Sequence, residues 1–417
     1  MTRPAARQHF PGKSLLSELP RDALLGHAME TLIQNRRRFL GTVAAATLLG
    51  PAIRANESRQ YKACVIGRTG GGDYGHGFDT IFSGLENVSV EGVADANPKG
   101  LDAAAARSGA KHKYSDYREM LEKEMPHLVS IAPRQPDCHR DMALAAIGVG
   151  AHFIMEKPFT EHLNEADEIF RAAKAKDLQI VVGHKNRYTR IFQEMKRHLD
   201  DGFLGHVLEM RVQGKQDQRA GGEDMIGLGT HDFDTMRYFF GDPISCSGIV
   251  TANGKPITKS DVRKGREPML VAGDTVHAQF QFPKNIHCSW HSAKVDDGWN
   301  ITPRAERWGF HIFGTKRILA YYSGSQPMYY DSPFLGHKTI TSDWKPLPDS
   351  GAPARPPHHA HLAKDLIHAV ETGSHPMCNG EDGRWTIEML AGVYESQRTG
   401  ALVQFPLQER TNPLLRL

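Results

Sequence analysis

The chain has 417 residues, of which 24% are charged and 40% hydrophobic, and this length is enough for two domains with buried cores. Its formal net charge is +3, but residues 1–55 alone carry eight Lys/Arg and three Asp/Glu, so the rest of the chain is slightly acidic. That part contains no basic stripe or charge block, so the sequence predicts no nucleic-acid partner.

The first segment, 1–55, has the pattern of an export signal. The twin-arginine pair Arg36-Arg37 is followed by a short, weakly apolar stretch at 41–50, which is too short to span a bilayer as a helix. We therefore expect the twin-arginine machinery to export the folded protein to the periplasm or beyond. An ordinary basic N-terminal helix is the alternative. Met29, just before the pair, offers a second start site for the chain.

Residues 56–183 alternate short apolar strands with helices, which predicts a parallel, doubly wound sheet, the Rossmann arrangement. The expected strands are Lys62–Ile66, Val88–Val93, Leu128–Ala132, His152–Met155 and Ile180–Val182, and the expected helices are Phe78–Leu85, Arg140–Val149 and Glu165–Ala175.

The first strand ends in a glycine-rich turn from Gly67 to Gly77. Gly70, Gly72 and Gly75 fit the pattern G-x-G-x-x-G, in which glycine lets the backbone approach a pyrophosphate. A strand before the turn and a helix after it are the context that a dinucleotide site requires. The usual pattern begins directly after the strand, at Gly67, so this turn carries a few extra residues. A flexible glycine loop is the alternative.

The second strand is followed by Asp95, whose carboxylate could accept hydrogen bonds from both ribose hydroxyls of a nucleotide. The same negative charge would repel the 2′-phosphate of NADP, and no Arg or Lys follows immediately. The sequence therefore predicts NAD as the cofactor in preference to NADP. The alternative is that Asp95 caps a helix before Asn97-Pro98.

The strand before residue 156 leads into Glu156-Lys157-Pro158, about ninety residues after the glycine turn. A dinucleotide turn followed at this distance by Glu-Lys-Pro resembles the Gfo/Idh/MocA oxidoreductases, the family of glucose–fructose oxidoreductase and inositol dehydrogenase. The resemblance extends roughly from Tyr61 to Leu407.

The resemblance implies that Lys157 takes the proton of a sugar hydroxyl as hydride leaves its carbon. Partial burial beside a positively charged nicotinamide would lower the pKa of Lys157 and make it a usable base. The resemblance also places Glu156, Pro133 and His139 with Lys157 on the nicotinamide side of the cofactor site.

Residues 184–417 show longer strands, several of which alternate apolar with polar side chains. This pattern predicts an α+β domain with a large, mostly antiparallel open sheet, through which we expect copies of the chain to associate as a homo-oligomer. The expected strands are Val207–Val212, Ile244–Thr251, Thr275–Phe282, Ile286–His291, Gly309–Phe313 and Ile318–Tyr322, and the expected helices are Asp232–Phe240, His358–Thr372 and Arg384–Thr399.

The segment from Gly227 to Asp234 resembles the family's glycine-then-histidine helix start. The resemblance implies that His231 contacts the reacting hydroxyl as a second acid/base group, and it makes Asp234 a candidate substrate contact. Members similar to inositol dehydrogenase carry an Asp four residues before this histidine, where this chain has Gly227. Asp224 or Glu223 would have to substitute for it. A histidine bonded to backbone at a helix start is the alternative.

Asn186-Arg187-Tyr188 resembles the family segment at the domain interface. Arg187 is therefore a candidate contact to cofactor or substrate, and a structural ion pair is an equal alternative. A sugar platform of aromatic and basic side chains competes with ordinary packing of tryptophan on a sheet. Its members would be Trp290, Trp299, Arg304, Arg307 and Trp308.

The run His358, His359 and His361 lacks the carboxylate or cysteine spacing of a metal site, and the family chemistry uses no metal, so no metal is predicted.

Together these features predict an exported, NAD-dependent oxidoreductase that oxidises or reduces a secondary alcohol of a sugar or polyol. Free NAD is scarce outside the cytoplasm, so we expect a tightly bound cofactor. A held cofactor permits a second interpretation, a redox-neutral enzyme that cleaves a glycoside or epimerises a sugar through a transient keto-sugar. A third is a non-catalytic sugar-binding protein that kept the fold.

Overall fold

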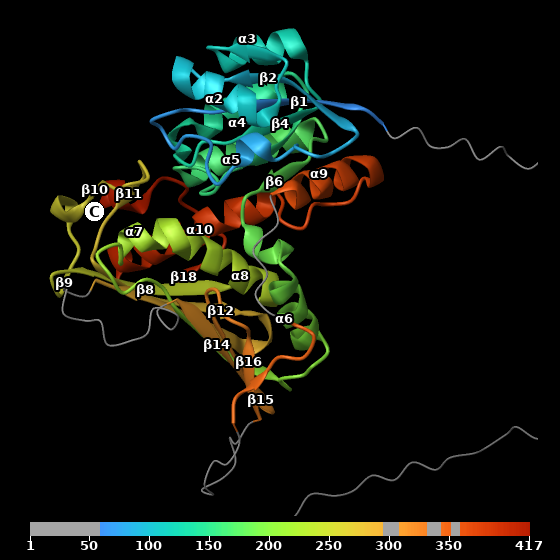
Figure 1. Ribbon diagram of the computed structural model, residues 1–417. Coiled ribbons are helices and arrows are strands. Elements are labelled where there is room, and N and C mark those ends of the chain that lie inside the picture. The colour runs from blue at the N-terminus through green and yellow to red at the C-terminus, as the bar shows by residue number, and fades with distance from the viewer. Residues whose placement is uncertain (1–58, 295–307, 332–342, 352–358) are drawn as a thin grey trace, which may run out of the picture. The chain divides into compact units, whose positions relative to one another are not determined.

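The structure, a computed structural model, describes residues 59–294, 308–331, 343–351 and 359–417 (Figure 1). The predicted leader, 1–55, lies outside these residues. Within them the chain forms a parallel sheet followed by a large mixed sheet, which confirms the predicted fold class. None of the described helices is both long enough and apolar enough to cross a bilayer.

The first sheet has six parallel strands in the order β3-β2-β1-β4-β5-β6. They are β1 (Tyr61–Ile66), β2 (Val88–Ala94), β3 (His112–Tyr114), β4 (Leu128–Ile131), β5 (His152–Met155) and β6 (Ile180–Val182). Helices cover both faces, which explains why the central strands are continuous apolar runs. The order reverses between β1 and β4, and ligands of such sheets bind outside the carboxyl ends of the strands at this point.

Helices α3, α4 and α5 contribute buried side chains to the core on one face of this sheet, and α2 does so on the other. Their bounds are α2 (Pro98–Ser108), α3 (Tyr117–Glu124), α4 (His139–Gly148) and α5 (Leu163–Ala175). The sequence predicted α4 and α5 but missed α2 and α3. The signals for both missed helices were their caps, since Asn97 and Asp116 accept hydrogen bonds from backbone N–H groups of the first turn.

The predicted helix at Phe78–Leu85 is wrong. The segment is a three-residue 3-10 turn, Phe78–Thr80, followed by further turns. The apolar spacing that suggested a helix is explained by burial, because Phe78, Ile81 and Phe82 all lie in the core. The glycines that bound the segment, Gly77 and Gly84, both have positive φ, which an α-helix does not accommodate.

Helix α9 (Ala360–Thr372) packs with this segment, although the sequence assigned it to the second domain. Its buried side chains Leu362 and Leu366 share a core with Phe78, Ile81 and Val65 of the first sheet. A doubly wound sheet needs cover on both faces, and α9 supplies the cover that the absent helix after β1 would have given.

The second sheet has ten strands, in the order β17-β16-β15-β14-β7-β13-β12-β8-β18 with β9 paired to β8. Its strands are β7 (Val207–Gln213), β8 (Ser245–Ala252), β9 (Lys255–Pro256), β12 (Thr275–Phe282), β13 (Ile286–Ala293), β14 (Gly309–Gly314), β15 (Arg317–Tyr322), β16 (Met328–Asp331), β17 (Lys345–Pro346) and β18 (Val403–Gln404). The pair β7–β13 is parallel and the other pairs are antiparallel. A separate short pair joins β10 (Arg263–Lys264) to β11 (Leu270–Val271).

Helices of the second half pack on one face of this sheet, so β12 and β13 alternate buried with more exposed residues, as predicted. The helices are α6 (Arg190–Asp200), α7 (Gly222–Asp224), α8 (Thr230–Phe240) and α10 (Gly380–Thr399). The sequence did not predict α6.

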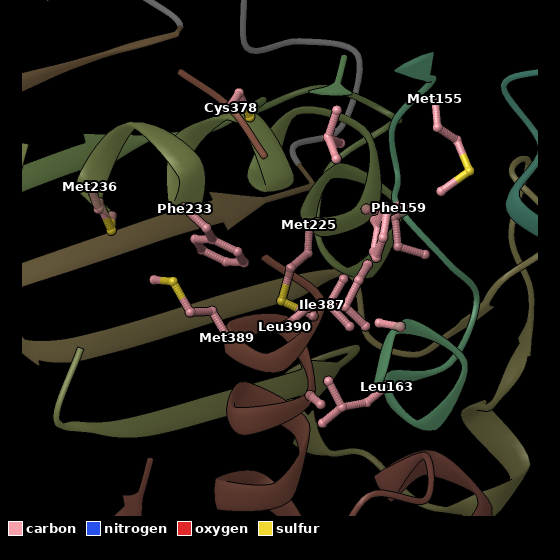
Figure 2. Packing of buried hydrophobic residues seen from close by; sticks show 14 of the residues in the cluster. Met155, Phe159, Leu163, Met225, Phe233, Met236, Cys378, Ile387, Met389 and Leu390 are labelled. Carbon is pink, nitrogen blue, oxygen red and sulfur yellow. The ribbon is translucent and has the colours of Figure 1, made fainter. Parts of the chain in front are cut away.

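Helix α10 connects the two cores. Figure 2 shows Ile387 and Leu390 of α10 in one cluster with Leu163 of α5 and Phe233 of α8. A Cβ on Gly383 would lie 2.8 Å from the Phe159 ring, so glycine allows this helix to approach the chain just after β5. The end of β5, where the Glu-Lys-Pro motif lies, is therefore supported by packing from both halves of the chain.

Candidate active site

The glycine-rich turn after β1 folds as a small hairpin. Arg68 and Asp73 exchange two backbone hydrogen bonds, of 3.2 and 2.9 Å, and Gly70 N donates to Asp73 Oδ1 at 2.8 Å. The extra residues of this turn are the tip of the hairpin. At the tip, Gly70 has φ 85°, and beyond its two chain neighbours no heavy atom of the described residues lies within 4 Å of the position that a Cβ would take. In this part of the chain its backbone is therefore open to a ligand.

Gly72 and Gly75, by contrast, are needed for close packing within the protein. A Cβ on Gly72 would lie 2.5 Å from the backbone nitrogen of Arg134, and one on Gly75 would lie 2.6 Å from the Glu156 carboxylate and 2.7 Å from the Ala132 carbonyl. These contacts bring the glycine turn against the loops after β4 and β5, at the point where the strand order reverses.

A pocket of about 510 Å³ opens at the carboxyl ends of β1 and β2. Its lining includes Gly67, Arg68, Asp95, Tyr117, Asp137 and Met142. A dinucleotide in this fold binds at such a position, so the place of the pocket fits a dinucleotide. The pocket contains Gly67 and Asp95 of the predicted set.

The Asp95 carboxylate is only 3% exposed and is already bonded. Its Oδ2 accepts hydrogen bonds from Thr69 N (3.0 Å) and Thr69 Oγ1 (2.6 Å), and its Oδ1 accepts one from Asn97 N (2.9 Å). The cap of α2 is Asn97, so Asp95 is not the capping residue that the sequence offered as the alternative. Its predicted contact with ribose stays a prediction, and that contact would have to be shared with Thr69.

His139, predicted to lie near the nicotinamide with Pro133, is fully buried, and both of its ring nitrogens face backbone carbonyls. Nε2 lies 2.7 Å from Pro133 O and Nδ1 lies 3.1 Å from Phe159 O. Burial lowers the pKa of His139, so the ring is neutral and donates to one of these carbonyls. His139 therefore ties the loop after β4 to the loop after β5, which is a supporting role and leaves no ring nitrogen for a cofactor.

Glu156 is buried under the motif. Its Oε1 accepts from His76 N (3.1 Å) and lies 2.5 Å from His76 Nδ1, and its Oε2 accepts from Lys157 N (2.8 Å). Burial alone would raise the pKa of Glu156, but the hydrogen bonds and charge of His76, with Lys157, leave it below its ordinary value. Glu156 is therefore an anion that fixes the backbone at Lys157 and fastens the glycine turn to it.

Lys157 is only 8% exposed, and its Nζ donates a hydrogen bond of 3.1 Å to the carbonyl of Gly227. Burial lowers the pKa of the Lys157 ammonium, and the negative charges of Glu156 and Glu267 partly oppose this. A lysine with a lowered pKa is the kind of group that can act as a general base near neutral pH. The structure thus brings Lys157 from the end of β5 to the segment that carries the second predicted residue, His231.

His231 follows a π-helical turn, Met225–Gly229, in the first turn of α8. Such turns frequently occur at functional sites. His231 is half-buried, and its Nδ1 is shielded from solvent without a partner among the described residues. Burial, followed by the charge of Lys157 and the neighbouring His184, holds the pKa of His231 well below its ordinary value. The ring is therefore neutral at pH 7 and can donate or accept a hydrogen bond.

Neither acid proposed to replace the missing Asp at Gly227 is paired with His231. Asp224 is fully buried and accepts from Lys215 N at 2.6 Å, with Lys215 Nζ 2.9 Å from its other oxygen. Glu223 pairs with Arg263 near β10. The hypothesis that one of them orients or charges His231 is therefore wrong, because these carboxylates already neutralise other cations.

His184 is a site residue that the sequence did not reveal. It lies two residues after the end of β6, is fully buried, and meets the ring of His231 edge-on with centroids 5.3 Å apart. Neither of its ring nitrogens has a partner in the described part of the chain. Burial lowers the pKa of His184 to about 4. Its position just after a parallel strand was the available signal.

Arg187 and Asp234, predicted to contact cofactor or substrate, bind each other instead. Arg187 Nη2 lies 2.8 Å from Asp234 Oδ1 and 3.1 Å from Asp382 Oδ1, and Arg187 Nη1 donates to Met377 O at 3.0 Å. Both side chains are buried. Since a buried charge needs a partner, the structure supports the ion-pair alternative, and this network joins the segment after β6 to α8 and α10.

The predicted sugar platform does not form as one surface. Trp290 is fully buried in the core, where its Nε1 donates to Asp232 Oδ2 at 2.8 Å. Trp308 is half-buried beside Lys215 and Arg219, whose cationic groups lie 5.9 and 5.3 Å from its ring centre. The other three members, Trp299, Arg304 and Arg307, lie outside the described residues.

The histidine run offers no metal site in the described residues, which include His359 and His361 but not His358. The one group of three potential ligands in this part of the chain is Glu194, His198 and Asp349. There, His198 Nε2 already lies 3.0 Å from Pro348 O.

Both halves of the chain match family models of oxidoreductases. A family model described as "Oxidoreductase family, NAD-binding Rossmann fold" matches residues 62–184, and a model of the "GFO/IDH/MocA C-terminal domain" matches residues 192–320. Together the two models cover more than half of the chain.

Two curated relatives are dehydrogenases. The chain is 29% identical over 174 residues to levoglucosan dehydrogenase from Pseudarthrobacter phenanthrenivorans, a match that covers 38% of this chain and 44% of that protein. It is 24% identical over 341 residues to D-apiose dehydrogenase from Paraburkholderia graminis, covering 79% of this chain and 86% of that protein. The chain thus spans less than half of the first relative but most of the second.

Solved structures resemble the whole fold. A levoglucosan dehydrogenase in complex with NADH and levoglucosan aligns with a TM-score of 0.66 at 19% identity, covering 84% of this chain and 100% of that chain. An aldose-aldose oxidoreductase from Caulobacter crescentus, complexed with glycerol, aligns with a TM-score of 0.63 at 17% identity, covering 83% and 100%. These likenesses show the fold.

Proposed function

The chain belongs to the GFO/IDH/MocA family of NAD-binding oxidoreductases, and we propose that it transfers hydride between NAD and a hydroxyl-bearing carbon of a sugar or polyol. The observation that carries the proposal is the buried Lys157, whose amine donates to Gly227 in the π-helical turn before α8. Burial, together with the charge of Lys157, lowers the pKa of both His231 and His184, which meet edge-on. The names of the relatives, which are sugar dehydrogenases, support the same class of substrate.

The cofactor would occupy the pocket at the carboxyl ends of β1 and β2. Gly67 and Asp95 line that pocket, and Gly70 offers open backbone at the tip of the glycine hairpin. When bound there, NAD supplies the carbon that accepts or gives up the hydride.

Lys157 Nζ takes the proton of the reacting hydroxyl in oxidation and returns it in reduction. Glu156 holds the backbone of Lys157 in place through its Oε2, and burial keeps the amine at a lowered pKa. His231 is neutral, so it orients the same hydroxyl by a hydrogen bond rather than by charge. His184 packs edge-on against His231 and fixes its ring.

The reaction is tested with the purified protein, after mass analysis has identified its bound nucleotide. Aldoses, polyols, sugar acids and glycosides are added singly, and absorbance of NADH is followed under single-turnover conditions. Net NADH supports a dehydrogenase, whereas a transformed sugar without net NADH supports the redox-neutral alternative. Failure of the whole panel to change either cofactor or sugar, with NAD verified as bound, would contradict both.

NAD is proposed in preference to NADP because the Asp95 carboxylate would face the ribose. We expect apo-protein to bind NAD more tightly than NADP, and the Asp95→Ala variant to lose much of this discrimination. Fluorescence titration with both cofactors measures it. Because Asp95 also holds Thr69, a Thr69→Val variant serves as the control for loss of that contact alone. Equal affinity of the parent for the two cofactors would remove Asp95 from this role.

Export by the twin-arginine route is proposed from the Arg36-Arg37 pair. Replacing both residues with lysine should leave the precursor in the cytoplasm, because the pathway reads the paired arginines. Fractionation and peptide mapping measure the result, and the mature N-terminus should fall near Asn56. Unchanged export of the double-lysine variant would be incompatible with this route. An export route for folded protein also suits a cofactor that is bound before export and held tightly.

We also propose that copies associate through the face of the second sheet on which no helix of the described residues packs. There Ile249 of β8 is 62% exposed, and its cross-strand neighbour His277 of β12 is exposed as well.

A further inference from the structure

We propose that Lys215 is a specificity-determining residue that binds the carboxylate of an acidic sugar, a uronic or aldonic acid, beside the carbon on which Lys157 acts. This inference rests on the proposed function in that both place a sugar next to Lys157. It goes further because it names the charge of the substrate and a residue that no family motif in the sequence pointed to.

Lys215 is held in a fixed position. It follows β7 by two residues, its backbone nitrogen donates to Asp224 Oδ2 at 2.6 Å, and its carbonyl accepts from Ser292 Oγ at 2.8 Å. A Cβ on the preceding residue, Gly214, would lie 2.4 Å from the Asp224 carboxylate, so glycine allows the backbone before Lys215 to approach that carboxylate closely. The Lys215 side chain is 16% exposed, which is low for a lysine.

The carboxylate of Asp224 holds the Lys215 ammonium in place by an ion pair. The Asp224 side chain is fully buried, and its Oδ1 lies 2.9 Å from Lys215 Nζ. Ser292 Oγ also lies 3.0 Å from Asp224 Oδ2, so its single proton is shared between this carboxylate and the Lys215 carbonyl. The contact is an ion pair with a single carboxylate oxygen, and an ammonium has three donors, so the pair holds Lys215 while leaving donors for a further acceptor.

Gly227 lies between the two lysines. Its carbonyl accepts from Lys157 Nζ at 3.1 Å, and a Cβ on it would lie 3.5 Å from Lys215 Nζ. Apart from the two neighbouring residues of the chain and the helix's own backbone, no other heavy atom of the described residues lies within 4 Å of that Cβ position. Because residue 227 has no side chain, nothing on it stands between a substrate and the Lys215 ammonium.

The surroundings of Lys215 are rich in donors. The ring of Trp308 lies near both Lys215 and Arg219, at 5.9 and 5.3 Å from its centre. Asp217 neutralises Arg219, at 2.6 Å, as Asp224 neutralises Lys215. Asp217 and Asp224 already pair with these cations, so the groups that face a substrate are the ammonium of Lys215 and the guanidinium of Arg219. Such charged donors bind a carboxylate of the substrate more strongly than a hydroxyl.

The expected preference can be stated as a fold-change. A charge-assisted hydrogen bond is about twice as strong as a neutral one, and in a partly buried site this difference corresponds to about tenfold in affinity. The parent protein loaded with NAD should therefore bind D-glucuronate about tenfold more tightly than D-glucose. Isothermal titration calorimetry measures both affinities and requires no turnover.

Lys215→Met should abolish this preference by weakening glucuronate binding while leaving glucose nearly unchanged, and Lys215→Arg should keep most of it. Lys345→Met is the matched control, since Lys345 also pairs with a carboxylate, Asp331, but on β17. Because Lys215→Met leaves Asp224 buried without its cation, the variant Lys215→Met/Asp224→Asn, which removes both charges, is measured beside it and should show the same loss.

Three results would overturn the inference: a parent protein that binds glucose as tightly as glucuronate, variants without Lys215 that keep the preference, or a parent that binds none of glucuronate, galacturonate and gluconate. The outcome is separable from that of the proposed function. Reduction of bound NAD by a neutral sugar, without a preference for acids, would support hydride transfer and reject the role of Lys215. A preference for acidic sugars without formation of NADH would support the role of Lys215 and reject hydride transfer.

Discussion

Lys157→Met is expected to slow the reduction of bound NAD by substrate by about 10²–10⁴-fold, the usual cost of losing a positioned acid/base group. Methionine matches the lysine side chain as far as Cε and lacks the amine. The glycine hairpin and the pocket beside β2 do not use the Lys157 amine, so NAD should still bind. Stopped-flow absorbance of NADH in a single turnover measures the rate, and titration measures cofactor affinity.

The matched control is Lys176→Met. Lys176 also donates from Nζ to backbone carbonyls, those of Ile147 and Gly148, but lies after α5 away from the site. Its loss should leave the rate unchanged. If Lys157→Met reduces its cofactor as fast as the parent, the proton leaves by another group and the proposed mechanism fails.

The pH dependence follows from the direction of the pKa shift. The neutral amine is the active base, and burial lowers the pKa of Lys157 below its ordinary value. The rate of oxidation should therefore rise with pH through that lowered pKa and level off before the pH at which a free lysine titrates, about 10.4. The rising limb should be absent from Lys157→Met. A limb at the ordinary lysine value would mean that Lys157 is not shielded from water during the reaction.

The sequence predicted best those features that depend on local pattern. Strands such as His152–Met155 and Thr275–Phe282 occur with the predicted bounds, because continuous apolar runs and strict alternation both reflect burial directly. The spacing of Phe78, Ile81 and Phe82 correctly indicated that these residues are buried, but it did not determine whether the backbone forms an α-helix. A 3-10 turn and the further turns that follow it bury the same three side chains. The cover that a helix would have given comes from α9, almost three hundred residues later.

The candidate site was predictable where a motif marked it and not where partners come from distant segments. Glu-Lys-Pro pointed to Lys157. The pairing of Lys215 with Asp224, however, appears only where the end of β7 meets α7, and that of His184 with His231 only where the end of β6 meets the start of α8. The pairing of Arg187 with Asp234 was not predicted for the same reason. Each residue was considered alone, whereas in the fold each is the other's counter-ion.

That pairing makes Arg187→Met the variant with the largest expected effect on stability. Removing one partner of a buried ion pair commonly costs about 3–5 kcal/mol, because the remaining charge is left uncompensated in the interior. Asp382 would keep its ion pair with Arg237, but among the described residues Asp234 would keep just the Cys378 thiol, at 3.8 Å. Urea unfolding of the NAD-free protein should therefore show a loss of several kcal/mol in the free energy of unfolding.

Arg197→Met is the matched control, since Arg197 on α6 also contacts acids, Glu194, Asp201 and Asp349, but at the surface. Solvent screens such pairs, so its loss should leave stability nearly unchanged. The double variant Arg187→Met/Asp234→Asn, which removes both buried charges, should recover part of the loss. If the Arg187→Met protein is instead stable and has a raised KM, Arg187 binds substrate. The loss of a residue that only binds substrate leaves no buried charge unpaired, so it would raise KM without lowering the free energy of unfolding.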